Sequence, residues 1–166
     1  FNPLNLMSEI VRSTELNMDF SDVVGNESAP PPTWLYLKDS KKQYDVSMPL
    51  SASGCFSILT LDQSPAEVME KVKGICVRSF DKIIGEMNES YNRFSEVAEP
   101  VAKGLPWKTK VMDFARLYEE ACSAHGQRFK AEYERKLEYL SQQMKDGSIN
   151  IIESNFALVE FVFDYI

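Results

Sequence analysis

Two long stripes of apolar residues, each repeating every three or four positions, restrict the fold of this chain more than any other feature. The first stripe runs through residues 64–99 and the second through residues 107–145. This spacing places apolar side chains on one face of a helix, whereas a half-exposed strand alternates at every second residue. The sequence therefore predicts two amphipathic helices, roughly 50 Å and 57 Å long at about 1.5 Å per residue.

The ends of these helices carry recognisable signals. Residues 64–67 read Ser-Pro-Ala-Glu, which combines a capping serine, a first-turn proline and a glutamate three residues after the cap. Residues 99–100, Glu-Pro, end the first helix, and Gly147 supplies the left-handed residue that ends the second. Because residues 101–106 form only a short connector, we expect the two helices to fold back as a long antiparallel hairpin.

Before the first long helix the apolar pattern has a period of two. Residues 34–37 are apolar, residues 44–50 alternate apolar and polar side chains, and residues 55–61 are rich in strand-favouring residues. These segments predict a β-hairpin or meander over residues 34–62. Residues 1–33 include three consecutive prolines, which favour an extended chain, and we expect this segment to be an arm or linker.

The sequence predicts a third helix over residues 149–166, which is apolar on two faces. One face consists of Ile149, Ile152, Phe156, Val159 and Phe163, and the other of Leu158, Phe161, Val162 and Tyr165. Such a helix is buried between other elements or covered by a second molecule. The predicted fold is α+β, mainly α, with a small N-terminal antiparallel β-sheet, a long antiparallel helical hairpin and a C-terminal helix. We expect residues 34–166 to form a single domain.

Composition and charge exclude several classes of function. The chain has 18 Lys and Arg against 25 Asp and Glu, a formal net charge of −7, so it lacks the basic surface of a nucleic-acid-binding protein. The same balance disfavours peripheral contact with an anionic membrane, and no apolar run reaches the roughly 18 residues of a spanning helix. A start at Phe1 agrees with a fragment, a processed product or a native start at Met7.

Few side chains in this sequence could support catalysis or hold a metal. The chain has one histidine, His125, and three cysteines, Cys55, Cys76 and Cys122. Cys122 and His125 lie three residues apart on the second long helix, and they are the candidate metal ligands or nucleophile and base. Close-spaced zinc-ligand pairs and glycine-rich phosphate loops are missing from the sequence. We therefore expect a chain that is not an enzyme, has no metal or cofactor, and uses its thiols to fill core space.

The candidate partner-binding residues are aromatic or basic. Aromatic side chains gather near both ends of the chain, and rigid aromatic rings anchor many protein contacts. Bases gather on the second long helix, where a solvated helix face is the plainer interpretation. The candidates are Trp34, Tyr36, Arg128, Lys130, Arg135, Phe156, Phe161, Phe163 and Tyr165.

These features favour a non-catalytic protein-interaction or assembly protein that acts through its long helices and its apolar C-terminal helix. An adaptor or a structural protein, including a viral one, fits this description, and we expect protein partners and homo-oligomers. One alternative is a secreted helical ligand or carrier of a small apolar molecule, which the sequons at Asn26 and Asn88 would suit. Another is an enzyme with an unrecognised Cys/His site. The odd number of cysteines favours an intracellular, cytoplasmic location over a secreted one.

Overall fold

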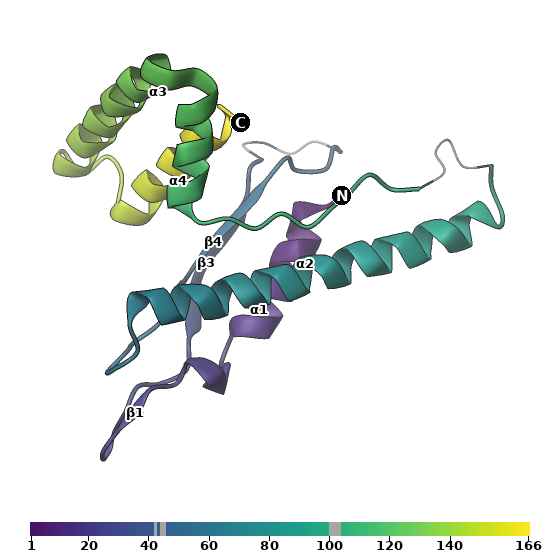
Figure 1. Ribbon diagram of the computed structural model, residues 1–166, viewed down its shortest axis with the longest axis horizontal. Helices are drawn as coiled ribbons and strands as arrows, with labels where there is room; N and C mark the ends of the chain where they lie inside the picture. The colour runs from purple at the N-terminus through teal and green to yellow at the C-terminus, as the bar shows by residue number, and fades with distance from the viewer. Residues whose placement is uncertain (42, 44–45, 100–103) are drawn as a thin grey trace. The chain divides into compact units, whose positions relative to one another are not determined.

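The computed structural model describes residues 1–41, 43, 46–99 and 104–166 (Figure 1). It confirms the α+β, mainly α class, because a small antiparallel sheet near the N-terminus is followed by most of the helical residues. The chain divides into two compact units, Phe1–Val111 (unit 1) and Met112–Ile166 (unit 2). This division differs from the single domain expected over residues 34–166, because each unit buries its own apolar residues.

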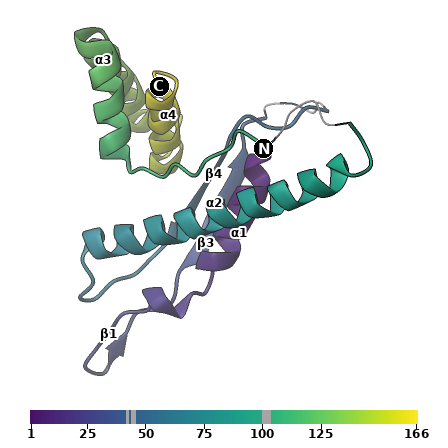
Figure 2. The ribbon, with the colours of Figure 1, turned by 45° about the vertical axis from the view of Figure 1, so that its right-hand side comes forward.

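Unit 1 is built in layers around its first helix. Its elements are α1 (Pro3–Thr14), the short 3₁₀ helix η1 (Met18–Phe20), β1 (Val23–Val24), β2 (Glu27–Ser28), β3 (Thr33–Asp39), β4 (Ala52–Ser57) and α2 (Pro65–Ser95). The strands β1 and β2 pair around a turn at Gly25, whose φ of 61° suits glycine. In Figures 1 and 2, α1 lies between α2 and the β3–β4 sheet, and it contacts both. The interior of unit 1 therefore forms around α1.

Residues 1–33 belong to the packed part of unit 1, which differs from the arm or linker expected there. Phe20 and Pro32 are fully buried. The backbone N–H of Leu16 donates to the carbonyl oxygen of Pro32 at 3.0 Å, which joins the end of α1 to the segment before β3. The prolines favour an extended backbone, but the apolar side chains around them give that segment a surface to bury.

The β3–β4 hairpin is the main sheet of unit 1 and accounts for part of the meander expected over residues 34–62. Trp34 pairs with Phe56, and their ring centroids are 5.0 Å apart. The register shifts at a bulge between Trp34 and Tyr36. A side chain at Gly54 would collide with the Trp34 ring, so this glycine permits the close approach of ring and backbone.

The alternating stretch at residues 44–50 does not form the expected strand in the part that the structure describes. Val46 and Leu50 are 96% and 97% exposed, so their apolar side chains have no sheet face to cover. Residues 44–45 lie outside the described residues. The strand expected over residues 55–61 ends at Ser57, and it begins earlier than expected.

α2 confirms the helix predicted over residues 64–99. The Ser64 hydroxyl accepts a hydrogen bond from the Glu67 backbone N–H at 3.3 Å, and the Glu67 carboxylate accepts one from the Ser64 backbone N–H at 2.8 Å. This capping box satisfies two donors of the first helical turn. α2 buries Ile75 and Ile83, and it packs against α1.

Unit 2 contains α3 (Phe114–Lys145) and α4 (Ile151–Phe163), and α3 is interrupted at Gly126. Gly126 has φ 57° and ψ −133°, a backbone conformation that side chains strongly disfavour. α3 therefore consists of two helical segments that meet at a turn, which differs from the single rod expected over residues 107–145. Residues 107–113 precede the helix, whose first turn is capped by the Asp113 carboxylate at 2.9 Å from the Arg116 N–H.

Each long helix has a packing partner within its own unit, whereas the predicted hairpin would join helices of the two units. Within its own unit α2 packs against α1, and within the other unit α3 packs against α4. The core of unit 2 forms around Phe129, which is fully buried and whose ring lies 5.3 Å from Tyr118 and 5.0 Å from Tyr165. Tyr118 precedes Gly126 in the sequence and Phe129 follows it. The turn at Gly126 therefore brings the two segments of α3 together, so that these two rings pack against each other. The long stripe of α3 is thus covered within unit 2.

Candidate protein-interaction surface

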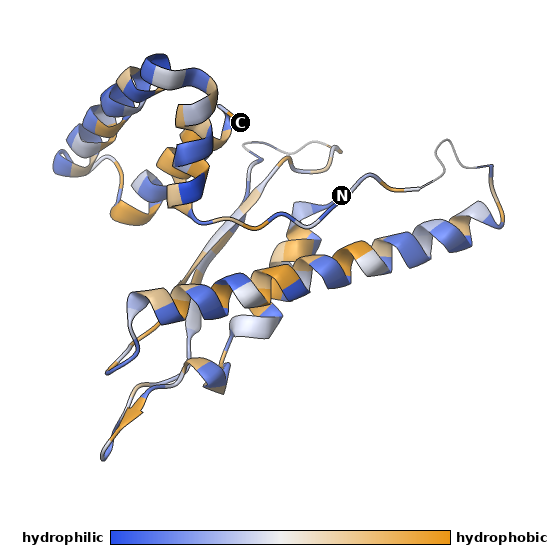
Figure 3. Ribbon diagram, viewed as in Figure 1, coloured by the Kyte–Doolittle hydropathy of each residue, from blue (hydrophilic) through white to orange (hydrophobic). Residues whose placement is uncertain are grey.

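Both units keep apolar side chains on their surface. In unit 1, β1 is hydrophobic in Figure 3, and its Val23 and Val24 are 66% and 48% exposed. In unit 2, Val159 and Phe163 of α4 are 43% and 66% exposed. The exposed residues of β1 occupy two neighbouring positions, whereas those of α4 continue an apolar pattern over successive helical turns. α4 is therefore the candidate interaction surface.

A complete capping box fixes the start of α4. The Asn150 side chain accepts a hydrogen bond from the Glu153 backbone N–H at 3.0 Å, and the Glu153 carboxylate accepts one from the Asn150 backbone N–H at 2.9 Å. The box satisfies two of the helix's first donors. The side chains of the following turns then project in directions set by the helical repeat.

One face of α4 packs against the core of unit 2. Val162 is fully buried and Ser154 is buried. The rings of Phe161 and Tyr165 lie 6.4 Å and 5.0 Å from the Phe129 ring. The packed face is the predicted face that contains Phe161, Val162 and Tyr165.

The other face of α4 carries the outer stripe, which we define as Ile152, Phe156, Val159 and Phe163. These residues are spaced by four, three and four positions, so they lie on one side of the helix. Ile152 and Phe156 are half-buried, whereas Val159 and Phe163 are exposed. The outer stripe thus becomes more exposed toward the C-terminal end of α4.

Acidic side chains follow one edge of the outer stripe. Glu153, Glu160 and Asp164, which we call the acidic edge, are spaced by seven and four positions and are all exposed. Residues 146–166 contain four acids and no Lys or Arg. Within the described part of the chain, the side chains of Glu160 and Asp164 form no ion pair. The apolar surface of α4 is therefore bordered by uncompensated negative charge.

Tyr165 fixes the C-terminal end of α4 to α3 by two polar contacts. Its hydroxyl donates a hydrogen bond to the Glu132 carboxylate, and its carbonyl oxygen lies 2.7 Å from Nε2 of His125. The hydrogen bond from Tyr165, together with the nearby Arg128 guanidinium, lowers the pKa of Glu132, and the same bond raises the pKa of Tyr165. The two contacts hold α4 at a fixed rotation, which keeps the outer stripe facing away from the core.

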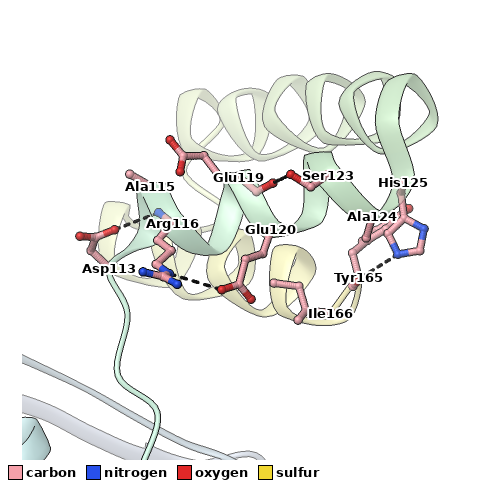
Figure 4. Close-up of a pocket in the computed structure, with 10 residues that line it drawn as sticks. All are labelled: Asp113, Ala115, Arg116, Glu119, Glu120, Ser123, Ala124, His125, Tyr165 and Ile166. Carbon is pink, nitrogen blue, oxygen red and sulfur yellow. Dashed lines mark hydrogen bonds and ion pairs between the residues drawn. The ribbon is translucent and has the colours of Figure 1, made fainter.

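A shallow groove of about 960 Å³ lies beside His125 in unit 2 (Figure 4). Its charged groups interact with one another, since the Arg116 guanidinium lies 3.4 Å from the Glu120 carboxylate. The Ser123 hydroxyl donates to the carbonyl oxygen of Glu119 at 2.8 Å, and His125 faces the Tyr165 carbonyl oxygen. In this groove the serine and the histidine therefore each contact a backbone carbonyl oxygen.

The candidate metal ligands Cys122 and His125 have separate partners as well. Cys122 is hydrogen-bonded to Tyr118, and this bond raises the pKa of the Tyr118 phenol. Cys55 belongs to β4, and Cys76 belongs to α2, where burial raises the pKa of its thiol. Among the described residues, no three His, Cys, Asp or Glu side chains group in a way that could hold a metal ion.

The aromatic candidates near the N-terminus have a structural role in unit 1. The Trp34 indole N–H donates to the Thr14 hydroxyl at 2.7 Å, and its ring packs at a tilt against the Phe56 ring. Tyr36 is half-buried and pairs with Cys55 across the sheet. The Trp34 side chain thus takes part in the contact between the sheet and α1, whereas Tyr36 is placed only by its strand pairing.

The candidates in unit 2 divide between surface and core. Arg128 and Arg135 are exposed; the Arg128 guanidinium forms an ion pair with Glu132 at 3.1 Å, while that of Arg135 bonds to the Ala131 carbonyl oxygen at 3.4 Å. The other exposed candidates are Lys130 and Phe163, and the half-buried ones are Phe156, Phe161 and Tyr165. Phe156 and Phe163 alone of these candidates belong to the outer stripe.

The sequence reasoning missed the acidic edge, although the spacing of its three carboxylates was available as a signal.

Comparisons with known proteins relate this chain to parts of longer proteins. No family model matches it, and no solved structure matches it. "Uncharacterized protein YqjN" of Bacillus subtilis (strain 168) is 29% identical over 144 residues, which cover 84% of this chain and 25% of that protein. "Protein RocB" of the same organism is 23% identical over 119 residues, which cover 72% of this chain and 21% of that protein. The chain therefore spans about a quarter of the length of the curated relatives that it matches.

The helices in the described part of the chain include none that combines the length and the apolar character needed to cross a bilayer.

Proposed function

We propose that this chain is a non-catalytic protein-interaction and assembly module, and that the outer stripe of α4 is its contact surface. The observation that carries the proposal is the exposure of Val159 and Phe163 on a helix whose opposite face is already packed. Covering a side chain such as phenylalanine contributes about 1.5–3 kcal/mol, so an uncovered stripe favours association with another protein.

The comparisons support a modular role. The chain resembles about a quarter of each of two longer proteins, which is the relation expected of a unit that works together with other parts. In this proposal the unit contributes a surface, and the polar contacts of Tyr165 hold that surface in a fixed orientation.

Self-association is one form of this function, and the charge of α4 determines how it depends on salt. Two copies that meet through their outer stripes bring acidic edges near each other, so repulsion weakens the contact at low ionic strength. We therefore propose homo-oligomers that are weak in dilute buffer and become stronger as salt screens the carboxylates.

Light scattering over a wide range of protein and salt concentrations tests the proposal. We expect reversible self-association that salt promotes and that Phe163→Ser abolishes. Val77→Ser is the matched control, because Val77 is an apolar residue on α2 that is 38% exposed. If the wild type and Phe163→Ser scatter alike, and also show equal retention on a hydrophobic-interaction column, the outer stripe is not a contact surface.

A further inference from the structure

The outer stripe and the acidic edge of α4 together restrict the chemistry of a partner. We propose that the partner of α4 is an amphipathic helix whose apolar residues are spaced by three and four positions and are flanked on one side by Lys or Arg. This inference rests on the proposed function, since it names the kind of partner that the same surface binds.

The spacing of the outer stripe indicates a helix. Its residues repeat at four, three and four positions from Ile152 to Phe163, which is the pattern that packs against the ridges of a second helix. The stripe extends over about 16 Å at roughly 1.5 Å per residue, so it matches about three turns of a partner.

The most exposed part of the stripe supplies an anchor for such a contact. Phe163 is 66% exposed and Val159 is 43% exposed, and Ile166, one turn beyond Phe163, is 54% exposed. A phenylalanine ring beside smaller apolar side chains is typical of residues that carry most of the binding energy in helix pairs. We expect Phe163 to fill a gap between apolar residues of the partner.

Charge distinguishes a basic helix from the α4 helix of a second copy of this chain. Glu160 and Asp164 form no ion pair within the described residues, and residues 146–166 contain no Lys or Arg. An α4 helix from a second copy brings only further carboxylates. A helix with bases along one flank pairs with the acidic edge, in the way that flanking charges select partners in coiled coils.

Two designed peptides of about 20 residues, long enough to form helix on contact, test the proposal. Both carry leucine at positions spaced by three and four; one has Lys on the flank and the other has Glu. Fluorescence polarisation with the full chain should show that the Lys peptide binds at least about tenfold more tightly than the Glu peptide. Added salt should weaken this binding, because it screens the attraction.

Two variants of the full chain identify the surface that binds the peptide. Phe163→Ser should lower the affinity of the chain for the Lys peptide at least about tenfold, whereas Val77→Ser should leave that affinity unchanged. Glu160→Lys with Asp164→Lys changes only exposed charges and should reverse the preference between the two peptides. Circular dichroism of each variant checks that the fold is intact.

The outcomes separate this inference from the proposed function. Equal binding of both peptides, or binding that Phe163→Ser does not alter, overturns the basic-helix inference. If neither peptide binds but salt-promoted self-association is lost in Phe163→Ser, the partner is a second copy, and the proposed function stands without the inference. If Phe163→Ser alters neither self-association nor peptide binding, both proposals are wrong.

Discussion

The indole N–H of Trp34 donates a hydrogen bond to the hydroxyl of Thr14 at 2.7 Å, and this bond joins β3 to the last turn of α1. Thr14 is fully buried, and its own hydroxyl donates to the carbonyl oxygen of Ile10 at 2.7 Å. The backbone N–H of Trp34 donates to the Glu15 carboxylate at 2.8 Å. The tryptophan is thus held twice by the end of α1, which fixes the sheet against that helix.

Replacing Thr14 by valine should destabilise unit 1 by about 1–3 kcal/mol, because the change keeps the shape of the side chain but leaves the indole N–H without its acceptor. Urea unfolding of the full chain, followed by tryptophan fluorescence, measures the effect. Thr60→Val is the matched control, since Thr60 is exposed. Equal unfolding midpoints for the two variants would show that the hydrogen bond contributes little.

Asp22 ties the segment before α2 to the rest of unit 1. Its carboxylate accepts backbone N–H hydrogen bonds from Gln63, Asp62 and Leu61 at 2.8, 2.7 and 2.7 Å. These bonds, that from Gln63 first, lower the pKa of Asp22 below its ordinary value of 3.8. Three donors that precede a helix are satisfied by one buried side chain.

Stability should depend on the ionisation of Asp22 at acid pH. Because its pKa is lowered in the folded state, the contribution of the carboxylate is complete above the ordinary value of 3.8 and is lost as pH falls through the lowered pKa. Urea midpoints of the wild type should therefore fall below about pH 4. Asp22→Asn should be less stable at neutral pH and should show a shallower fall. Parallel curves for the two proteins would contradict this assignment.

The start of α2 was predictable because its signal is local, whereas α3 begins at Phe114, seven residues later than expected. The capping box involves only Ser64 and Glu67, three positions apart, and the structure forms it as the sequence indicates. The break at Gly126 was not predictable in this way, since the apolar stripe continues on both sides of the glycine. Glycine occurs both inside helices and at turns, and here the packing of Tyr118 against Phe129 accompanies the turn.

The packing partners depend on contacts between distant residues, which a local pattern does not contain. Residues 1–33 read as a linker because of their prolines, yet Phe20 gives them buried surface in unit 1. For α4 the sequence predicted two apolar faces correctly, but it could not say which one packs. The contact of Tyr165 with Glu132 decides this, because it binds one face to α3 and leaves Phe163 outside.

The central position of Phe129 predicts a large effect of its removal. Phe129→Ala should lower the free energy of unfolding of unit 2 by about 3–5 kcal/mol, because the lost ring leaves a cavity between the two segments of α3 and α4. Leu137→Ala is the control on the same helix, since Leu137 is 43% exposed and its loss should cost less than about 1 kcal/mol. Near-ultraviolet circular dichroism during urea unfolding follows the tyrosines around the cavity. Similar losses for both variants would show that Phe129 is not the centre of this core.

Two glycines in helical sequence should respond oppositely to alanine. Gly126 has φ 57° and ψ −133°, and a methyl group there would meet no atom within 4 Å, so the cost of Gly126→Ala is backbone strain, about 1–3 kcal/mol. Gly85 lies inside α2 with helical backbone and equally open space, and Gly85→Ala should stabilise the chain by about 1 kcal/mol. Differential scanning calorimetry of both variants gives the signs. A rise in the unfolding temperature of Gly126→Ala would mean that α3 is a continuous helix, because alanine favours that state and penalises the turn.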